Sequence, residues 1–149
     1  MRIIFIILFF ALYFTNIISA NEKNYYLILK NNEVNVRYGP GFDYPVKYVY
    51  KKKNLPIKVI DKKENFRKII DFKKNSGWIH SSQLKKGKSF ILLEDKVLFK
   101  NPTKYSKPLI KMAKGRLLLV KKCKKEWCKV KTENYFGWIK TDNIWGNIK

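Results

Sequence analysis

Short runs of alternating polar and apolar residues follow one another along most of the chain. The segments Glu33–Tyr38 and Pro45–Tyr50 alternate in this way, and Pro56–Ile60 follows a few residues later. Alternation with a period of two is typical of half-buried β-strands, because successive side chains point to opposite faces. No window of eleven or more residues after position 21 follows the helical period. The pattern therefore predicts an all-β protein.

Each half of the chain contains the same series of predicted strands. In the first half, Phe66–Ile70 faces Pro56–Ile60 across a loop at Asp61–Asn65, and Gly77–Ile79 forms the last long strand. The equivalent segments of the second half are Leu117–Lys122, Trp127–Lys131 and Gly137–Ile139. Short strands at this spacing predict a small barrel or sandwich in each half.

These segments belong to an internal repeat. Gly77–Leu84 matches Gly137–Ile144 position by position. Upstream of these two segments, the matched residues lie one position further apart, and they are Val36 with Val97, Tyr38 with Phe99, Val59 with Val120, Phe66 with Trp127 and Ile69 with Val130. The repeat predicts that one structural unit occurs twice in tandem.

The N-terminus has the pattern of a secretory signal peptide. A basic start at Arg2 precedes the apolar run Ile3–Phe14, and Ile18–Ala20 offers a cleavage site of small residues. An uncleaved membrane anchor is the alternative, but it needs about 20 apolar residues and this run is shorter and interrupted. No cysteine lies near the site, so a lipid anchor is not expected. We expect cleavage after Ala20, a periplasmic location and no integral membrane segment in the mature chain.

The charge is large and spread along the chain. Among 149 residues, 33 are Lys or Arg and 11 are Asp or Glu, which gives a formal net charge of +22. Hydrophobic residues make up 46%, so the chain is too apolar for a disordered polycation. Only four of the basic residues are Arg, the residue that grips phosphate best, and an exported chain does not meet nucleic acid. A solvated surface explains the lysines, with attraction to anionic envelope polymers as the alternative.

The chain has two cysteines, in one predicted hairpin. A turn at Lys125–Glu126 places Cys123 and Cys128 opposite each other, at about the 4.5–5.5 Å between Cα atoms that a disulfide can bridge. In an exported protein such a pair indicates a structural disulfide, worth roughly 2 kcal/mol for so small a loop. A redox-active pair and a metal half-site that lacks two further ligands are the alternatives.

The residues that enzymes commonly use are scarce. His80 is the only histidine, and no free nucleophile is matched to it in the sequence. No two acidic residues recur in a shared apolar surrounding that would push their pKa values apart, as acid–base catalysis by two carboxyls requires. The chain also has neither a Gly-rich phosphate loop nor an H-E-x-x-H motif. We therefore expect no enzymatic activity, no cofactor and no metal.

The segment Val36–Val46, with the sequence VRYGPGFDYPV, resembles the first strand and turn of the bacterial SH3-like (SH3b) domain. The later hairpin that ends in an aromatic residue and the Gly-Trp-Ile strand complete this resemblance. The mature chain is similar to exported tandem SH3-like proteins of Gram-negative bacteria. The resemblance implies two small barrels, at residues 27–84 and 90–145, joined by a linker at 85–89.

The resemblance also implies a ligand site without catalysis. Such barrels bind extended peptides or peptidoglycan stems on an aromatic platform beside the first long loop. The residues of this chain at those positions are Tyr38, Phe42, Tyr44, Trp78 and His80. Trp78 has an alternative place in the core. The second copy departs from the pattern, with Lys100-Asn101-Pro102 in place of the Gly-Pro turn.

We therefore expect a monomeric binding module for peptidoglycan or a segment of an envelope protein. Polycationic adhesion to envelope polymers, or a structural role in an envelope complex, are the alternatives.

Overall fold

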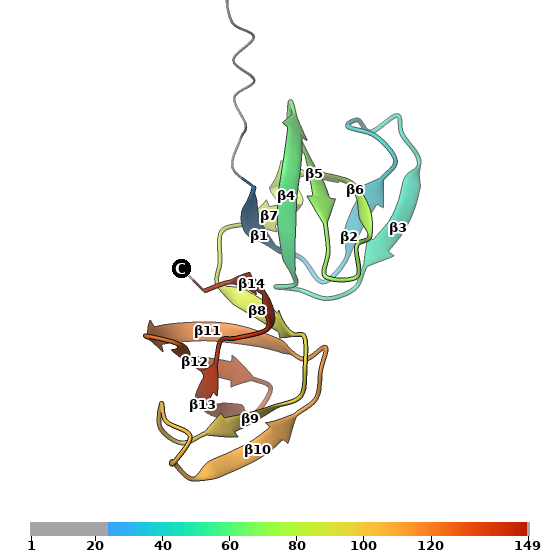
Figure 1. Ribbon diagram of the computed structural model, residues 1–149. Helices are drawn as coiled ribbons and strands as arrows, with labels where there is room; N and C mark the ends of the chain where they lie inside the picture. The colour runs from blue at the N-terminus through green and yellow to red at the C-terminus, as the bar shows by residue number, and fades with distance from the viewer. Residues whose placement is uncertain (1–23, 149) are drawn as a thin grey trace, which may run out of the picture.

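The computed structural model describes residues 24–148, which form two sheets of seven strands each (Figure 1). The predicted signal peptide and its cleavage site lie outside the described residues. The strands of the first unit are β1 (Tyr25–Leu29), β2 (Val34–Arg37), β3 (Val46–Tyr50), β4 (Pro56–Lys63), β5 (Phe66–Ile70), β6 (Ser76–His80) and β7 (Leu84–Lys85). A single 3-10 turn, η1 (Ser81–Gln83), lies between β6 and β7. Within residues 24–148, no helix is long and apolar enough to cross a membrane.

The second unit repeats this series of strands. They are β8 (Ser89–Leu92), β9 (Lys96–Phe99), β10 (Pro108–Met112), β11 (Leu117–Lys124), β12 (Trp127–Thr132), β13 (Tyr135–Lys140) and β14 (Ile144–Asn147). The strand order is β3-β2-β6-β5-β4-β1-β7 in one sheet and β10-β9-β13-β12-β11-β8-β14 in the other. Every strand thus has its counterpart in the same place, and the prediction of two tandem all-β units is confirmed.

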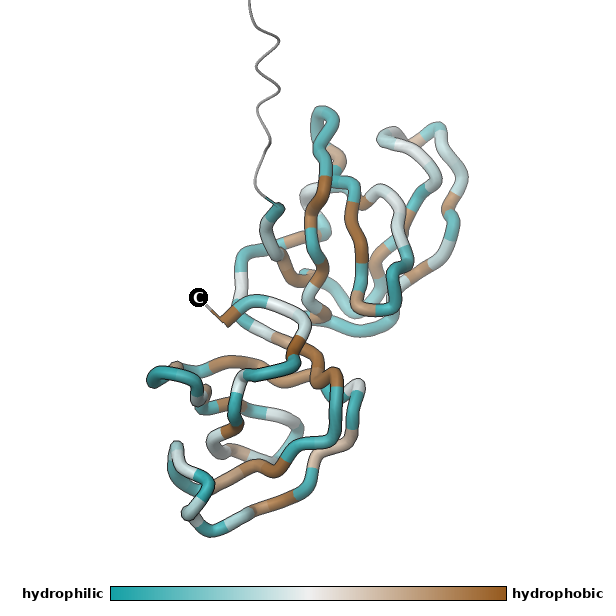
Figure 2. Tube along the Cα trace, in the orientation of Figure 1, coloured by the Kyte–Doolittle hydropathy of each residue, from teal (hydrophilic) through white to brown (hydrophobic). Residues whose placement is uncertain are grey.

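Each unit encloses an apolar core formed by the inward residues of its strands. Fully buried examples are Val36 and Ile79 in the first unit and Leu98 and Ile139 in the second. Hydrophobic stretches lie along the strands of both units, whereas the loops at their tips are hydrophilic (Figure 2). The alternation in the sequence therefore corresponds to one buried and one solvated face.

The repeat register differs from the sequence prediction in β2 and β9. Arg37 pairs with Trp78, but the residue that pairs with Trp138 is Phe99. A Cβ atom on Gly77 would overlap the Val36 side chain, and one on Gly137 would lie 2.7 Å from Leu98. Phe99 therefore corresponds to Arg37 and not to Tyr38, and Leu98 corresponds to Val36. The predicted alignment of β2 with β9 is wrong by one residue.

The turn after β9 is also retained, contrary to the sequence prediction. The amide of Gly41 donates to the carbonyl of Gly39 at 3.0 Å, and Thr103 donates to Asn101 at 2.8 Å. Both turns therefore have the same length and the same internal hydrogen bond, and Asn101 replaces a glycine. The loss of the glycine in the sequence did not mean the loss of the turn.

The predicted hairpin loop at Asp61–Asn65 is wrong, because β4 continues to Lys63. A bulge between Val59 and Asp61 shifts the register, after which Lys62 pairs with Arg67 and Lys63 with Phe66. This end of the hairpin extends beyond the core, so its residues are exposed and polar. For that reason the sequence pattern indicated a loop where the structure has strand.

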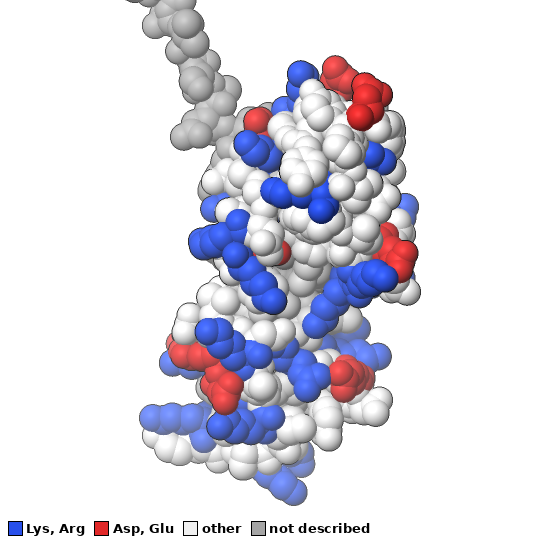
Figure 3. All heavy atoms as spheres, turned by 90° about the vertical axis from the view of Figure 1, so that its right-hand side faces the viewer, with Lys and Arg blue, Asp and Glu red and all other residues white. Residues whose placement is uncertain are grey.

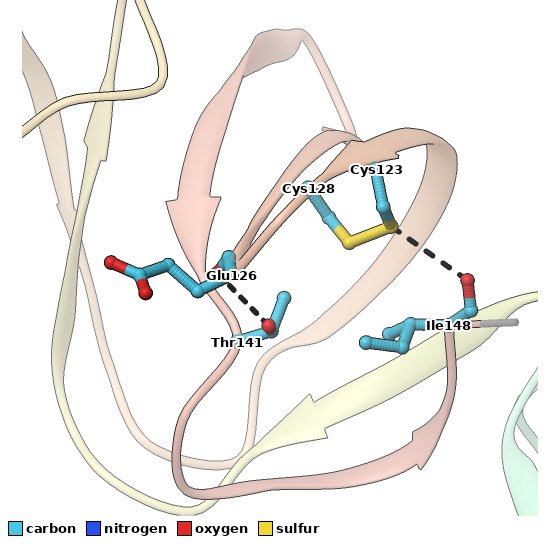
Figure 4. Close-up of a disulfide and its surroundings, with 5 residues drawn as sticks. All are labelled: Cys123, Glu126, Cys128, Thr141 and Ile148. Atoms are coloured by element: carbon cyan, nitrogen blue, oxygen red, sulfur yellow. Dashed lines mark hydrogen bonds between the residues drawn. A yellow bond between two sulfur atoms is a disulfide. The ribbon is translucent and has the colours of Figure 1, made fainter.

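The predicted disulfide is confirmed at the equivalent hairpin of the second unit. Cys123 and Cys128 face each other across β11 and β12 and are joined by a disulfide (Figure 4). Cys128 is fully buried in the core, whereas Cys123 is exposed and its sulfur lies 3.7 Å from the carbonyl oxygen of Ile148. The bridge therefore fastens the hairpin beside the last strand.

The two units pack against each other. Ile91 of β8 is buried in the core cluster of the first unit, and the rings of Tyr26 and Trp145 meet edge to face at 5.6 Å. The buried Ser89 hydroxyl donates to the carbonyl of Asn54 at 2.8 Å, and the Lys74 ammonium lies 5.5 Å from the Trp145 ring. These contacts hold the units in one arrangement.

Candidate functional site

The loop between β2 and β3 is fixed by an arginine at the end of β2. Nη1 of Arg37 donates hydrogen bonds to the carbonyl oxygens of Tyr44 at 2.7 Å and Phe42 at 3.2 Å. The same guanidinium lies 5.4 Å from the centre of the Phe42 ring, within cation–π range. The loop thus holds an exposed aromatic ring in a defined place.

Tyr44 folds back over the start of this loop. A Cβ atom on Gly39 would overlap the Tyr44 ring, so glycine is required for this close approach. The amide of Tyr38 donates to the carbonyl of Pro45 at 3.2 Å and closes the loop.

Three rings from separate segments meet beside the loop. The Phe42 ring lies 5.3 Å from Phe66 and 5.2 Å from His80, and Phe66 and His80 are 5.1 Å apart. Phe66 and His80 are neighbours across β5 and β6. Phe66 is buried and Phe42 is 64% exposed, so the cluster runs from the sheet to the solvent.

His80 is held by the turn that follows it. The Ser82 amide donates to Nδ1 of His80 at 3.3 Å, and the Ser82 hydroxyl lies 2.7 Å from the same nitrogen. Nδ1 therefore accepts a hydrogen bond, which assigns the proton of the neutral ring to Nε2. Among residues 24–148, no hydrogen bond joins His80 to a carboxylate, and the Ser82 contact is that of a cap on η1.

The structure brings together three of the five predicted residues. Phe42, Tyr44 and His80 line a groove of about 430 Å³, called here the first groove, together with Asp43, Glu64 and Phe66. Tyr38 and Trp78 do not line it. Tyr38 is 63% exposed beside the Lys47 ammonium, and the half-buried Trp78 lies between Arg37 and Lys68 on the outer face of the sheet.

The sequence prediction missed Phe66 as a groove residue. Its signal was present, because Phe66 begins β5 directly after the hairpin and Trp127 occupies the same place in the repeat. Phe66 faces His80 in the regular ladder between β5 and β6, and this pairing of two separate strands is not visible in the local sequence pattern.

A family model for the bacterial SH3 domain matches the chain twice, at residues 30–86 and 94–146. Each match begins just after the first strand of one sheet and spans the other six strands, and together the matches cover more than half of the chain. This protein belongs to the bacterial SH3 domain family. The resemblance noted for Val36–Val46 is thereby confirmed, and the units are called the first (β1–β7) and second (β8–β14) SH3 domains below.

No curated protein matches the chain by sequence. Two solved structures, of NlpC2 and NlpC1 from Trichomonas vaginalis, are similar at a low level, with TM-scores of 0.38 and identities of 10% and 11%. The matches cover 85% and 87% of this chain but 49% and 48% of those proteins. The chain thus spans about half the length of each.

The second SH3 domain has a groove at the equivalent edge, with a volume of about 560 Å³. This second groove is lined by Phe99 and Trp127, by Lys104 of the loop after β9, and by the acids Asp95, Glu126 and Asp142. The rings of Phe99 and Trp127 meet edge to face at 5.8 Å. The two grooves therefore share their location but differ in their side chains.

A buried lysine, paired with two half-exposed carboxylates, supports the second groove. The side chain of Lys96 is 8% exposed, and its ammonium lies 2.8 Å from Glu94 and 2.9 Å from Asp142. Hydrogen bonds from Lys96 lower the pKa of both carboxyls. Burial alone lowers the pKa of Lys96, but its two carboxylate partners outweigh burial and raise that pKa.

Lysine and arginine side chains are spread over both SH3 domains, as Figure 3 shows for one face. Within residues 24–148, no group of three His, Cys, Asp or Glu side chains is placed to hold a metal ion.

Proposed function

We propose that this protein is a non-catalytic, exported binding protein whose first groove holds an extended peptide. The peptide is a cell-wall stem or an extended segment of an envelope protein. The observation that carries this proposal is the three-ring cluster in which Phe42, on the loop fixed by Arg37, meets Phe66 of β5 and His80 of β6. A rigid, exposed aromatic surface binds at a low entropy cost because it does not have to be ordered on contact.

Export is supported by two features of the chain. The segment 1–20 has the signal-peptide pattern, and the Cys123–Cys128 disulfide fits an oxidising compartment such as the periplasm. Family membership fits the same location.

A binding role without catalysis is supported by the surroundings of His80. Its bonds to Ser82 cap a turn, and among the described residues no carboxylate orients the ring as it would in a catalytic triad. Adhesion through the lysines is the second candidate, and on the face shown in Figure 3 the basic residues are spread over both domains with acidic residues between them.

The test is a pull-down of residues 21–149 on purified peptidoglycan sacculi, at low and high salt. Phe42→Ala should weaken binding at least about tenfold, since it removes the exposed ring of the cluster. Tyr38→Ala is the matched control, because Tyr38 is an equally exposed ring of the same loop outside the groove. Sacculi freed of stem peptides by an amidase should lose binding if the stem is the ligand.

Other outcomes identify the alternatives. Binding that vanishes at high salt and ignores Phe42→Ala would assign the interaction to the lysines and overturn the groove. If sacculi bind nothing, the same variants are tested on periplasmic protein extract. A partner lost with Phe42→Ala but retained with Tyr38→Ala would support the envelope-protein segment, and equal capture by both variants would contradict the proposal.

A further inference from the structure

The second groove is an opened version of the first. In the register that sets Phe99 at the place of Arg37, Lys104 takes the place of Phe42. The ring that covers Phe66 and His80 in the first domain thus has no counterpart in the second, and the arginine beneath it is replaced by the Phe99 ring. The volume is accordingly about 560 Å³ instead of about 430 Å³. Trp127 and Phe99 are left as an aromatic floor.

Carboxylates surround this floor. Four acids and three lysines line the second groove, in a chain with 11 acidic and 33 basic residues. The acids come from three different turns: Asp95 from the turn before β9, Glu126 from the β11–β12 hairpin, and Asp142 from the segment after β13. Positions 126 and 142 correspond to the uncharged Asn65 and Ser82 of the first domain.

Two of these carboxylates are fixed, and one has no partner. The Lys96 ammonium forms ion pairs with both Glu94 and Asp142, and these two carboxylates neutralise its positive charge. The backbone carbonyl of Glu126 accepts hydrogen bonds from the amide and the hydroxyl of Thr141, both at 2.9 Å. Its carboxylate points away from the disulfide (Figure 4), and no residue in the described range forms an ion pair or hydrogen bond with it.

The aromatic rim already accommodates an ammonium group. The Lys104 ammonium lies 5.2 Å from the centre of the Tyr105 ring, which is 86% exposed. A flexible, exposed lysine is easily displaced, so the same ring can receive a cation from outside.

We propose that the second SH3 domain binds a lysine or arginine side chain of an extended peptide segment in the second groove. The aliphatic stem of such a side chain packs on Trp127 and Phe99, and its charged end meets Glu126 and Asp95. One oxygen of Asp95 accepts a hydrogen bond from the Lys114 amide at 2.9 Å, and its other oxygen forms an exposed pair with Lys111 at 3.4 Å, which an incoming cation can exchange. Elsewhere the excess of positive charge repels such a segment, so the groove is selective as well as attractive. This site does not depend on whether the first groove binds anything.

The experiment measures calorimetric binding of a blocked seven-residue peptide of alternating alanine and lysine to residues 21–149. The same peptide with acetylated lysines is the ligand control, because acetylation removes only the charge and a donor. We expect the lysine peptide to bind and the acetylated peptide not to bind. The double change Glu126→Gln with Asp95→Asn should weaken binding about fivefold to tenfold, as loss of two exposed charge contacts allows.

Three further variants locate the site. Asp61→Asn removes one acid outside both grooves and should leave binding within about twofold of wild type. Trp127→Phe keeps an aromatic floor of the type seen at Phe66 and should retain binding, whereas Trp127→Leu should weaken it. Lys104→Ala should strengthen binding more than Lys107→Ala, an exposed lysine of the same loop outside the groove.

The proposal is overturned if the lysine peptide does not bind, or if the acetylated peptide binds equally well. It is also overturned if Glu126→Gln with Asp95→Asn has no larger effect than Asp61→Asn. Loss of peptide binding in Phe42→Ala would move the site to the first groove. Because sacculi are not used, failure here leaves the role proposed for the first groove standing.

Discussion

In the first SH3 domain an arginine fixes the loop beside the groove, whereas in the second domain Phe99 takes the place of that arginine. The two loops nevertheless close in the same way, since Tyr38 donates to Pro45 at 3.2 Å and Lys100 donates to Lys107 at 3.0 Å. Backbone hydrogen bonds and inward side chains therefore maintain the frame. Outward side chains are free to differ, and the two grooves differ in just those positions.

The same comparison applies to the hairpin that forms one wall of each groove. Lys62 and Arg67 face each other in the first domain, where Cys123 and Cys128 form the disulfide in the second. Both hairpins carry a bulge at the equivalent point, between Val59 and Asp61 and between Val120 and Lys122. The bridge is thus an addition to a frame that already exists without it.

The largest effect is expected where the two domains meet. Ile91 belongs to β8 of the second domain but is buried in the core of the first. Ile91→Ala should reduce the free energy of unfolding by about 2–5 kcal/mol, because it leaves a cavity at the junction. It should also uncouple the two domains, so that they unfold in two separate transitions instead of one. Urea titrations followed by amide signals assigned to each domain will measure both effects.

The control for this prediction is Ile139→Ala, which removes the same side chain inside the second core. It should lower the unfolding midpoint of the second domain more than that of the first. If Ile91→Ala leaves the midpoint of the first domain unchanged, the domains do not share a core.

A smaller effect is expected from the disulfide, and only in the second domain. Reduction, or Cys123→Ala, should cost that domain roughly 2 kcal/mol of unfolding free energy, from the small loop that the bridge closes. The first domain, with Lys62 and Arg67 in place of the cysteines, should keep its midpoint. Thermal unfolding with and without reductant will test this, and an equal shift of both domains would mean that the bridge supports the junction as well.

Local patterns in the sequence were not sufficient for the flanking strands β1, β7, β8 and β14, but they were sufficient for β2 to β6, for the existence of the repeat and for the cysteine pair. These depend on alternation and on spacing within one hairpin, so neighbouring residues carry the information. The register of β9 was misjudged because Val97 resembles Val36 in hydrophobicity, while the residue that points inward at the start of β9 is Lys96. A buried lysine cannot be recognised without its partners, and its partner Asp142 comes from a distant part of the chain, after β13.

The candidate site was predictable in part for the same reason. Phe42 and Tyr44 lie on one loop, and His80 directly follows the predicted strand Gly77–Ile79, so the family resemblance was enough to name them together. The place of Phe66 depends on the pairing of β5 with β6, and that of Trp78 depends on which face of β6 is turned outward. The second groove was overlooked because its turn appeared to be lost, although Asn101 maintains it.

The last prediction concerns the pH dependence of stability, which should differ between the two domains because only the second has Lys96. Val34 occupies the inward position of Lys96 in the first domain. In the second, hydrogen bonds from Lys96 lower the pKa of Glu94 and Asp142. A carboxyl with a lowered folded-state pKa stabilises the fold above its unfolded pKa of about 4, and this stabilisation is lost as pH falls through the folded-state pKa.

We therefore expect the second domain to lose stability below about pH 4 through this cluster. Lys96→Met removes the ion pair and fills the inward position with an apolar side chain of similar length. The difference in stability between wild type and Lys96→Met should shrink as pH falls from about 5 to about 2. Asp95, whose pKa is lowered first by the amide of Lys114, is unchanged in the variant and provides the background slope. Urea unfolding across this pH range will measure the difference, and parallel curves for the two proteins would show that Lys96 contributes nothing to the acid response.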